Sequence, residues 1–166
     1  MLFRKINNHF GYNRTQIKRR MFKMAAVSHE YHLAALDIKR EYENRKGREP
    51  YLVIEFDEKE TFVASKLIPY SVPVAVERST GFIVGVGLAS FHPRRSANIA
   101  RRKYGQLPDR RREAFNEVCE YIKRYAGGRK VIICTDQKRE YRTWISEELP
   151  LTLHYAVPSA SKKNKN

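Results

Sequence analysis

Residues 51–62 read YLVIEFDEKETF and place Asp57 and Glu58 directly behind six mostly apolar residues that favour a β-strand. Carboxylates are costly where an element enters a protein core, so an acid at this position needs a reason. A second apolar run, KVIICTD at residues 130–136, also ends on an acid, Asp136. A short continuous apolar run is typical of an interior strand. If the two strands are neighbours in one sheet, Asp57 and Asp136 meet at their ends.

Two carboxylates a few ångströms apart repel each other, and a divalent cation that binds both removes this penalty. The pair therefore predicts a Mg²⁺ or Mn²⁺ site, with Asp57 and Asp136 as metal ligands and catalytic residues. Such a site binds phosphate oxygens, activates a water or a 3′ hydroxyl and stabilises the leaving oxygen in phosphoryl transfer. The simpler alternative is that each Asp caps a turn or a helix. By strand alternation Glu58 faces away from Asp57, so we expect it to support the site or to be solvated.

The composition favours one main domain with a polyanionic partner. The 166 residues include 33 Lys and Arg against 18 Asp and Glu, a formal net charge of +15, which suits DNA, RNA or an anionic membrane surface. No stretch approaches the roughly 20 apolar residues of a membrane span, and no signal-peptide pattern follows Met1. We therefore expect a cytoplasmic, nucleoid-associated protein. Cys119 and Cys134 lie in apolar segments and are expected to be core residues rather than zinc ligands or a disulfide.

Residues 1–49 are predicted to be a basic helical segment that ends in a linker. Apolar residues at helical spacing predict one helix before Gly11 and another that begins at Asn13, a typical N-cap residue. This pattern suits a DNA-binding helix-turn-helix, and the alternative is a solvated basic face on an ordinary helical hairpin. Ser28 predicts the start of a further helix. The candidate DNA-binding residues of this segment are Arg14, Lys18, Arg19 and Arg20.

Residues 50–157 are predicted to form a mixed α/β core. The pattern indicates strands at 51–56, 68–76 and 81–91, a helix at 109–125, a strand at 130–136, a helix around Trp144 and a strand at 151–157. The second and third strands are expected to form an antiparallel hairpin. The segment 91–112 predicts a basic loop, and residues 158–166 predict a disordered polar tail. Further candidate DNA-binding residues in the loop are Arg94, Arg95, Arg101, Arg102 and Lys103.

Four stretches, FDEKETF, VPVAVERSTGFIVGV, ANIARRKYG followed by DRRRE, and ICTDQKREY, resemble in this order the catalytic core of DDE transposases from bacterial and archaeal insertion sequences. The resemblance covers about residues 51–157 and implies a ribonuclease-H-like fold, with three antiparallel strands followed by helix, strand, helix and strand. It implies that Asp57 and Asp136 are the first two catalytic acids and that the cofactor is Mg²⁺ or Mn²⁺. The implied activity is cleavage of transposon ends and joining of their 3′ hydroxyls to target DNA, by a homodimer or larger assembly.

The family's third acid, usually a Glu on a helix beyond the last strand, has no counterpart in this chain. The last acid is Glu148, which is predicted to lie on the helix before the last strand. The chain is accordingly expected to be a truncated remnant, or the upstream frame of a frameshifted element. A metal-dependent transposase and an inactive, DNA-binding remnant both stay open, and a junction resolvase with a ribonuclease-H-like fold is a third possibility.

Overall fold

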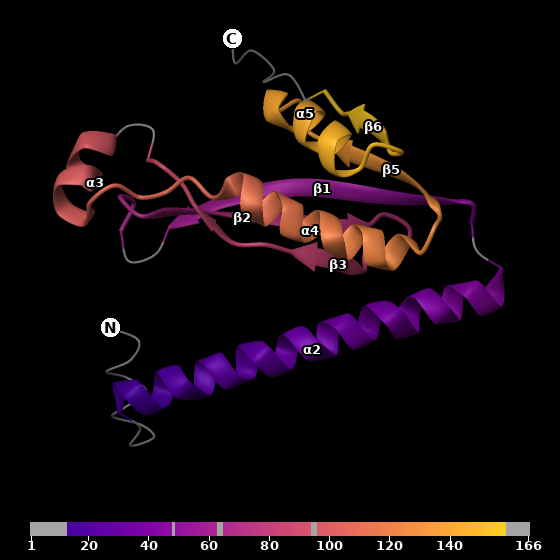
Figure 1. Ribbon diagram of the computed structural model, residues 1–166, viewed down its shortest axis with the longest axis horizontal. Helices are drawn as coiled ribbons and strands as arrows, with labels where there is room; N and C mark the ends of the chain where they lie inside the picture. The colour runs from indigo at the N-terminus through magenta and orange to yellow at the C-terminus, as the bar shows by residue number, and fades with distance from the viewer. Residues whose placement is uncertain (1–12, 48, 63–64, 94–95, 159–166) are drawn as a thin grey trace, which may run out of the picture. The chain divides into compact units, whose positions relative to one another are not determined.

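The computed structural model describes residues 13–47, 49–62, 65–93 and 96–158 (Figure 1). The chain divides into two compact units, Met1–Arg45 and Lys46–Asn166. Each unit is described by itself.

The first unit contains the long helix α2 (Arg14–Lys46). Asn13 caps it: its side-chain oxygen accepts a hydrogen bond from the Gln16 backbone N–H at 2.9 Å, and the Gln16 side chain accepts one from the Asn13 N–H at 2.9 Å. This reciprocal pair is a capping box, and it confirms the predicted N-cap. The helix that the sequence predicts before Gly11 lies outside the described residues, so the helix-turn-helix stays a prediction.

The helix predicted to start at Ser28 is wrong, because α2 runs through this position without a break. The sequence between residues 14 and 46 contains neither Gly nor Pro, and a Ser inside a helix costs only a few tenths of a kcal/mol relative to the better helix formers. A typical N-cap residue is therefore not sufficient to begin a new helix where the preceding residues continue the old one.

The second unit is built on a mixed sheet of six strands with the order β3-β2-β1-β5-β6, in which β4 also pairs with β2 (Figure 1). The strands are β1 (Tyr51–Phe62), β2 (Pro69–Glu77), β3 (Ile83–Val86), β4 (Ala89–Ser90), β5 (Lys130–Thr135) and β6 (Leu153–Ala156). The pairs β1–β2, β2–β3 and β2–β4 are antiparallel, whereas β5 is parallel to β1 and β6 is parallel to β5. This arrangement confirms the predicted α/β fold with a ribonuclease-H-like order of elements.

Three helices accompany the sheet: α3 (Ala97–Tyr104), α4 (Arg111–Ala126) and α5 (Arg139–Glu148). The sequence predicted α4 and α5, but it predicted a loop where α3 lies. Only Ala100 of α3 is buried, so this short helix lacks the repeated apolar positions by which a helix is recognised. In Figure 1, α3 lies beyond the end of the sheet at which β1 ends and β2 begins.

The core lies between the sheet and the pair of helices α4 and α5. Leu52, Ile54 and Phe56 alternate along β1 and are buried. The Phe56 ring lies 5.3 Å from the ring of Phe115 on α4 and 5.2 Å from that of Tyr141 on α5, between ring centroids. Both helices therefore pack on the same face of the sheet.

Two glycines let α4 lie close to β3. A Cβ atom on Gly85 would lie 2.9 Å from the Tyr121 side chain, and one on Gly87 would lie 2.8 Å from the backbone carbonyl oxygen of Ala114. No larger residue fits either position without moving the helix.

The opposite face of the sheet carries the other half of each strand. Glu55 and Asp57 point to this face from β1, and Tyr155 of β6 is 63% exposed on it. α4 and α5 both lie on the first face, and among the described residues of this unit no helix packs on the opposite face. Across the described ranges of the chain, no helix is long and apolar enough to cross a membrane.

Candidate functional site

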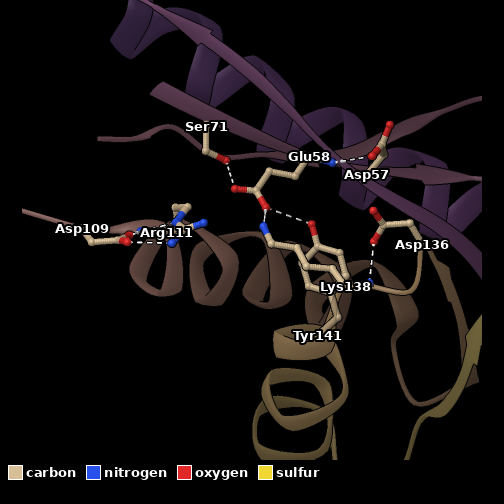
Figure 2. A network of polar contacts seen from close by, with 8 residues as sticks. All are labelled: Asp57, Glu58, Ser71, Asp109, Arg111, Asp136, Lys138 and Tyr141. Atoms are coloured by element: carbon tan, nitrogen blue, oxygen red, sulfur yellow. Dashed lines mark hydrogen bonds and ion pairs between the residues drawn. The ribbon is translucent and has the colours of Figure 1, made fainter. Parts of the chain in front are cut away.

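The pairing of β1 with β5 sets the positions of Asp57 and Asp136. The last parallel pair joins Glu55 to Cys134, an offset of 79 residues (134 minus 55). Continued two residues beyond that pair, the same offset would bring Asp136 opposite Asp57. Side chains two residues apart along a strand share a face, and neighbouring strands lie about 4.8 Å apart. The two carboxylates therefore lie side by side, as Figure 2 shows.

The electrostatics of Tyr141 agree with this placement. The pKa of this phenol is raised, first by burial and then by the negative charges of Glu58, Asp136 and Asp57. One ring therefore lies within electrostatic reach of both aspartates. The sequence expectation that their strand ends lie together agrees with this geometry, and their catalytic and metal-binding roles stay predictions.

Each aspartate uses one oxygen within the protein and leaves the other free. Asp57 Oδ1 accepts a hydrogen bond from the Glu58 backbone N–H at 2.7 Å, and Asp136 Oδ1 accepts one from the Lys138 N–H at 3.2 Å. Asp136 thus also caps the turn into α5, which is the simpler role that its position suggests. The Oδ2 atom of each carboxylate has no hydrogen-bond or ion-pair partner in the part of the chain that the structure describes.

This donor set fits Mg²⁺ or Mn²⁺. Mg²⁺ prefers oxygen ligands, keeps several waters and is usually held by one or two carboxylates together with substrate phosphates. Asp57 and Asp136 are exposed, adjacent and each have a free oxygen. Within the described residues, no group of three or more His, Cys, Asp or Glu side chains is arranged to hold a metal ion. The two aspartates would therefore supply only some of the ligands of such an ion, and water or substrate phosphates would supply the others.

Glu58 lies on the other side of β1 from Asp57, as strand alternation predicts, and it is the centre of a buried polar network (Figure 2). Its carboxylate accepts hydrogen bonds from the Ser71 hydroxyl, from the Lys138 ammonium group and, at 3.0 Å, from the Tyr141 hydroxyl. Burial alone raises the pKa of Glu58, but hydrogen bonds from Lys138 and Ser71 outweigh it, so the pKa is lowered. Glu58 is therefore a buried anion paired with a cation.

The sequence alone does not indicate that Lys138 and Tyr141 belong to the site. They lie 80 and 83 residues from Glu58 along the chain, and each is an ordinary residue of an amphipathic helix start. The only local signal was Glu58 itself, an acid on the core side of a strand that otherwise buries apolar residues.

Two hollows lie next to each other near α5, and Asp136 lines the first of them. The first, of about 450 Å³, is lined by Glu58, Glu60, Asp136, Gln137, Lys138, Glu140 and Tyr141. The second, of about 890 Å³, lies between α5 and β6 and shares three of these residues, Gln137, Lys138 and Glu140. Arg139 and Arg142 also line the second hollow. The hollow that Asp136 lines therefore adjoins a second one to which Arg139 and Arg142 contribute positive charge.

A further cation borders the site from α4. The Arg111 guanidinium donates to both carboxylate oxygens of Asp109, at 3.0 and 2.7 Å, and its hydrogen bonds are the main reason that the pKa of Asp109 is lowered. The pKa of Arg111 is raised, first by Asp109 and to a smaller extent by the charges of Glu58 and Glu140. Arg111 is thus within electrostatic reach of the acidic part of the site (Figure 2).

The basic residues that the sequence analysis selected lie on several elements. Lys18, Arg19 and Arg20 are exposed on α2, and the Arg14 side chain is not among those that the structure describes. Arg101, Arg102 and Lys103 are exposed in the last turn of α3, and Arg94 and Arg95 lie outside the described residues. Their contacts with DNA stay a prediction.

No protein-family model matches this chain, and no curated protein matches its sequence. Among solved structures, the catalytic domain of the Mos1 mariner transposase matches with a TM-score of 0.41 and 15% identity, over 80% of this chain and 61% of that one. RNase H1 from the halophilic archaeon Halobacterium salinarum matches with a TM-score of 0.31 and 13% identity, over 66% of this chain and 87% of that one. This chain therefore spans about three fifths of the mariner catalytic domain. Likenesses of this size say nothing of reaction or substrate, and the fold described above rests on the strand order itself.

Proposed function

We propose that this protein is a metal-dependent phosphoryl-transfer enzyme that cleaves and joins DNA strands in transposition. One observation carries the proposal: Asp136, directly after the end of β5, lies beside Asp57 of the neighbouring strand β1, and each has a free carboxylate oxygen (Figure 2). The resemblance of FDEKETF and ICTDQKREY to transposase motifs around these two residues supports the same chemistry.

In this mechanism the positions of the two aspartates are fixed by different contacts. Asp57 is held by its pairing with Val74 of β2, and Asp136 by the hydrogen bond that its carboxylate accepts from the Lys138 N–H. Their free oxygens would hold Mg²⁺ or Mn²⁺, which when bound supplies positive charge to the phosphate and leaving oxygens. The side chains of Arg139 and Arg142, which line the hollow between α5 and β6, would bind phosphates of the DNA.

DNA is the partner that the charge distribution favours. The chain has a formal net charge of +15, and exposed cations lie on α2 and α3 as well as near the aspartates. Such charges bind phosphates by releasing counterions and without regard to base sequence. The motif resemblance further supports a homodimer or larger assembly on DNA, associated with the nucleoid of the cytoplasm.

The test is a plasmid-nicking assay with Mg²⁺ or Mn²⁺, comparing the full chain with Asp57→Asn and Asp136→Asn. We expect each substitution to lower the nicking rate by about 100-fold or more, because the reaction depends on placement of the metal ion. Glu55→Gln is the matched control: it removes a carboxylate two residues earlier on β1, which pairs with the exposed Arg78 at 3.4 Å. Nicking that persists in both Asn variants contradicts the proposal.

A second candidate, an inactive DNA-binding protein, is favoured by one observation. In the described ranges, no third carboxylate, histidine or cysteine joins the two aspartates in a metal-binding group. If this candidate is correct, the chain binds DNA in a salt-dependent way, the two Asn substitutions leave that binding unchanged, and no nicking occurs with either metal.

A further inference from the structure

The two aspartates are not held equally firmly by the sheet. β1 continues to pair with β2 beyond Asp57, as far as Phe62, so Asp57 lies within a strand that is paired on one side. β5 ends at Thr135, and Asp136 lies in the turn that leads to α5. The distance between the two carboxylates therefore depends on what fixes this turn to β1.

One ion pair joins the two segments just beyond the aspartates. Glu58 follows Asp57 directly, Lys138 follows Asp136 by two residues, and their side chains pair. The Glu58 side chain is 6% exposed and that of Lys138 is 18% exposed, so solvent and salt screen the pair only weakly.

Two hydrogen bonds fix Glu58 in place. The Ser71 hydroxyl donates to Glu58 from β2, and the Tyr141 hydroxyl donates to it from α5 at 3.0 Å. Glu58 is therefore bound to β2, the neighbour of its own strand, and to α5, the helix that follows the turn. Its oxygens are directed into this network and away from Asp57, so it is not available as a metal ligand (Figure 2).

We propose that the Glu58–Lys138 ion pair is a positioning device that holds Asp136 opposite Asp57, so that one divalent cation can bind both carboxylates. The inference rests on the proposed metal-dependent function and adds two residues to it. The regular β1–β5 pairs end at Glu55 and Cys134, so backbone pairing does not hold the turn against β1. Without the ion pair, repulsion between the two carboxylates therefore drives the turn away from β1. A displacement of about 1 Å in such a site is enough to lower a rate by about 100-fold.

Mn²⁺ titration of the full chain tests the inference, with Glu58→Gln, Lys138→Met, the double variant and the conservative Lys138→Arg. We expect Glu58→Gln and Lys138→Met each to raise the Mn²⁺ Kd by about tenfold or more. The Kd of the double variant should be no higher than that of the single variant that binds Mn²⁺ more weakly. The Kd of Lys138→Arg should stay close to that of the unsubstituted chain. A second readout needs no metal: exchange of the Lys138 amide hydrogen, which is bonded to Asp136 Oδ1, should become about tenfold faster in Glu58→Gln.

Glu148→Gln is the matched control for lost stability. It removes the charge of another partly buried Glu on α5, which pairs with Arg112 at 3.1 Å on the side of α5 that faces α4. We expect it to lower the Tm without changing the Mn²⁺ Kd. If Lys138→Met does not fold, Tyr141→Phe takes its place, because it removes one hydrogen bond from Glu58 and keeps the ion pair. A rise of about threefold in its Kd is then the supporting result.

The outcomes separate the inference from the proposed function. If the unsubstituted chain binds Mn²⁺ and Asp57→Asn abolishes binding, while the Glu58 and Lys138 variants bind with unchanged Kd and only lose thermal stability, the ion pair is merely structural and the inference is wrong. If the unsubstituted chain does not bind Mn²⁺ through Asp57, the proposed function itself fails, and the inference fails with it.

Discussion

At the scale of single residues, His154 is one group near the site whose titration affects stability. Its Nε2 lies 2.8 Å from Thr135 Oγ1, and that hydroxyl also donates to the Asp136 carbonyl oxygen at 2.7 Å. The pKa of His154 is lowered, first by burial and second by the positive charge of Arg142. The folded chain therefore binds fewer protons at this residue than the unfolded chain does.

This sets the direction of a pH effect. The stabilising contribution of neutral His154 is complete above the unfolded pKa, about 6.5, and is lost as the pH falls through the lower folded pKa. We expect the free energy of unfolding to decrease between pH 7 and pH 5, and we expect His154→Gln to flatten that part of the curve. Urea unfolding of the unsubstituted chain and of His154→Gln at a series of pH values measures this pH dependence of the free energy of unfolding. Parallel curves for the two proteins contradict the prediction.

How much of the site can be predicted from the sequence also depends on single residues. Asp57 and Asp136 each end an apolar run, and this local pattern is sufficient to predict that they lie together. Lys138, Tyr141 and Arg111 become part of the site only because β1, α5 and α4 meet there. Nothing within a few residues of each one signals this, since such contacts depend on the tertiary fold.

At the scale of elements, prediction succeeded where apolar residues recur and failed where they do not. β2 and β5 consist largely of β-branched or apolar residues, and both were predicted nearly to their ends. β1 is longer than predicted because the polar residues after Phe56 pair with β2 as far as Phe62. Pairing with β2 therefore keeps residues 57–62 extended, although their polar sequence does not predict a strand.

The contact of α4 with β3 gives a prediction for one glycine. In Gly87→Ala the new methyl group would lie 2.8 Å from the Ala114 carbonyl oxygen, which belongs to the helix backbone and cannot rotate away. We expect a loss of about 1–3 kcal/mol in the free energy of unfolding, as for other overpacked sites. Chemical denaturation measures the loss. An unchanged denaturation midpoint would mean that α4 moves away from β3 without cost.

At the scale of the whole molecule, the excess of positive charge should appear as a salt dependence of DNA binding. The logarithm of the binding constant should fall linearly with the logarithm of the salt concentration, because phosphate contacts release counterions. In Arg101→Gln, Arg102→Gln and Lys103→Gln, we expect the magnitude of this slope to fall by about 1 for each phosphate contact removed. Fluorescence anisotropy at several salt concentrations measures the slope.

Lys130→Gln provides the comparison for this experiment. It removes the same charge at the start of β5, where Lys130 lies over the Tyr51 ring at 5.9 Å from its centroid, and far from α3. Its slope should match that of the unsubstituted chain. If the α3 variants and Lys130→Gln behave alike, α3 makes no particular contact with DNA.

The offset of 79 residues between β1 and β5 has a consequence for how the chain length can vary. One residue inserted inside β5 would rotate Asp136 to the covered side of the sheet, into the space between the strands and α4 and α5. Two inserted residues would return it to the open side, but about 6.6 Å further along. An insertion at Gly127 or Gly128, in the turn before β5, changes neither the side of the sheet on which Asp136 lies nor its position along the strand. Natural length differences that keep the chemistry should therefore occur in turns and spare the strands.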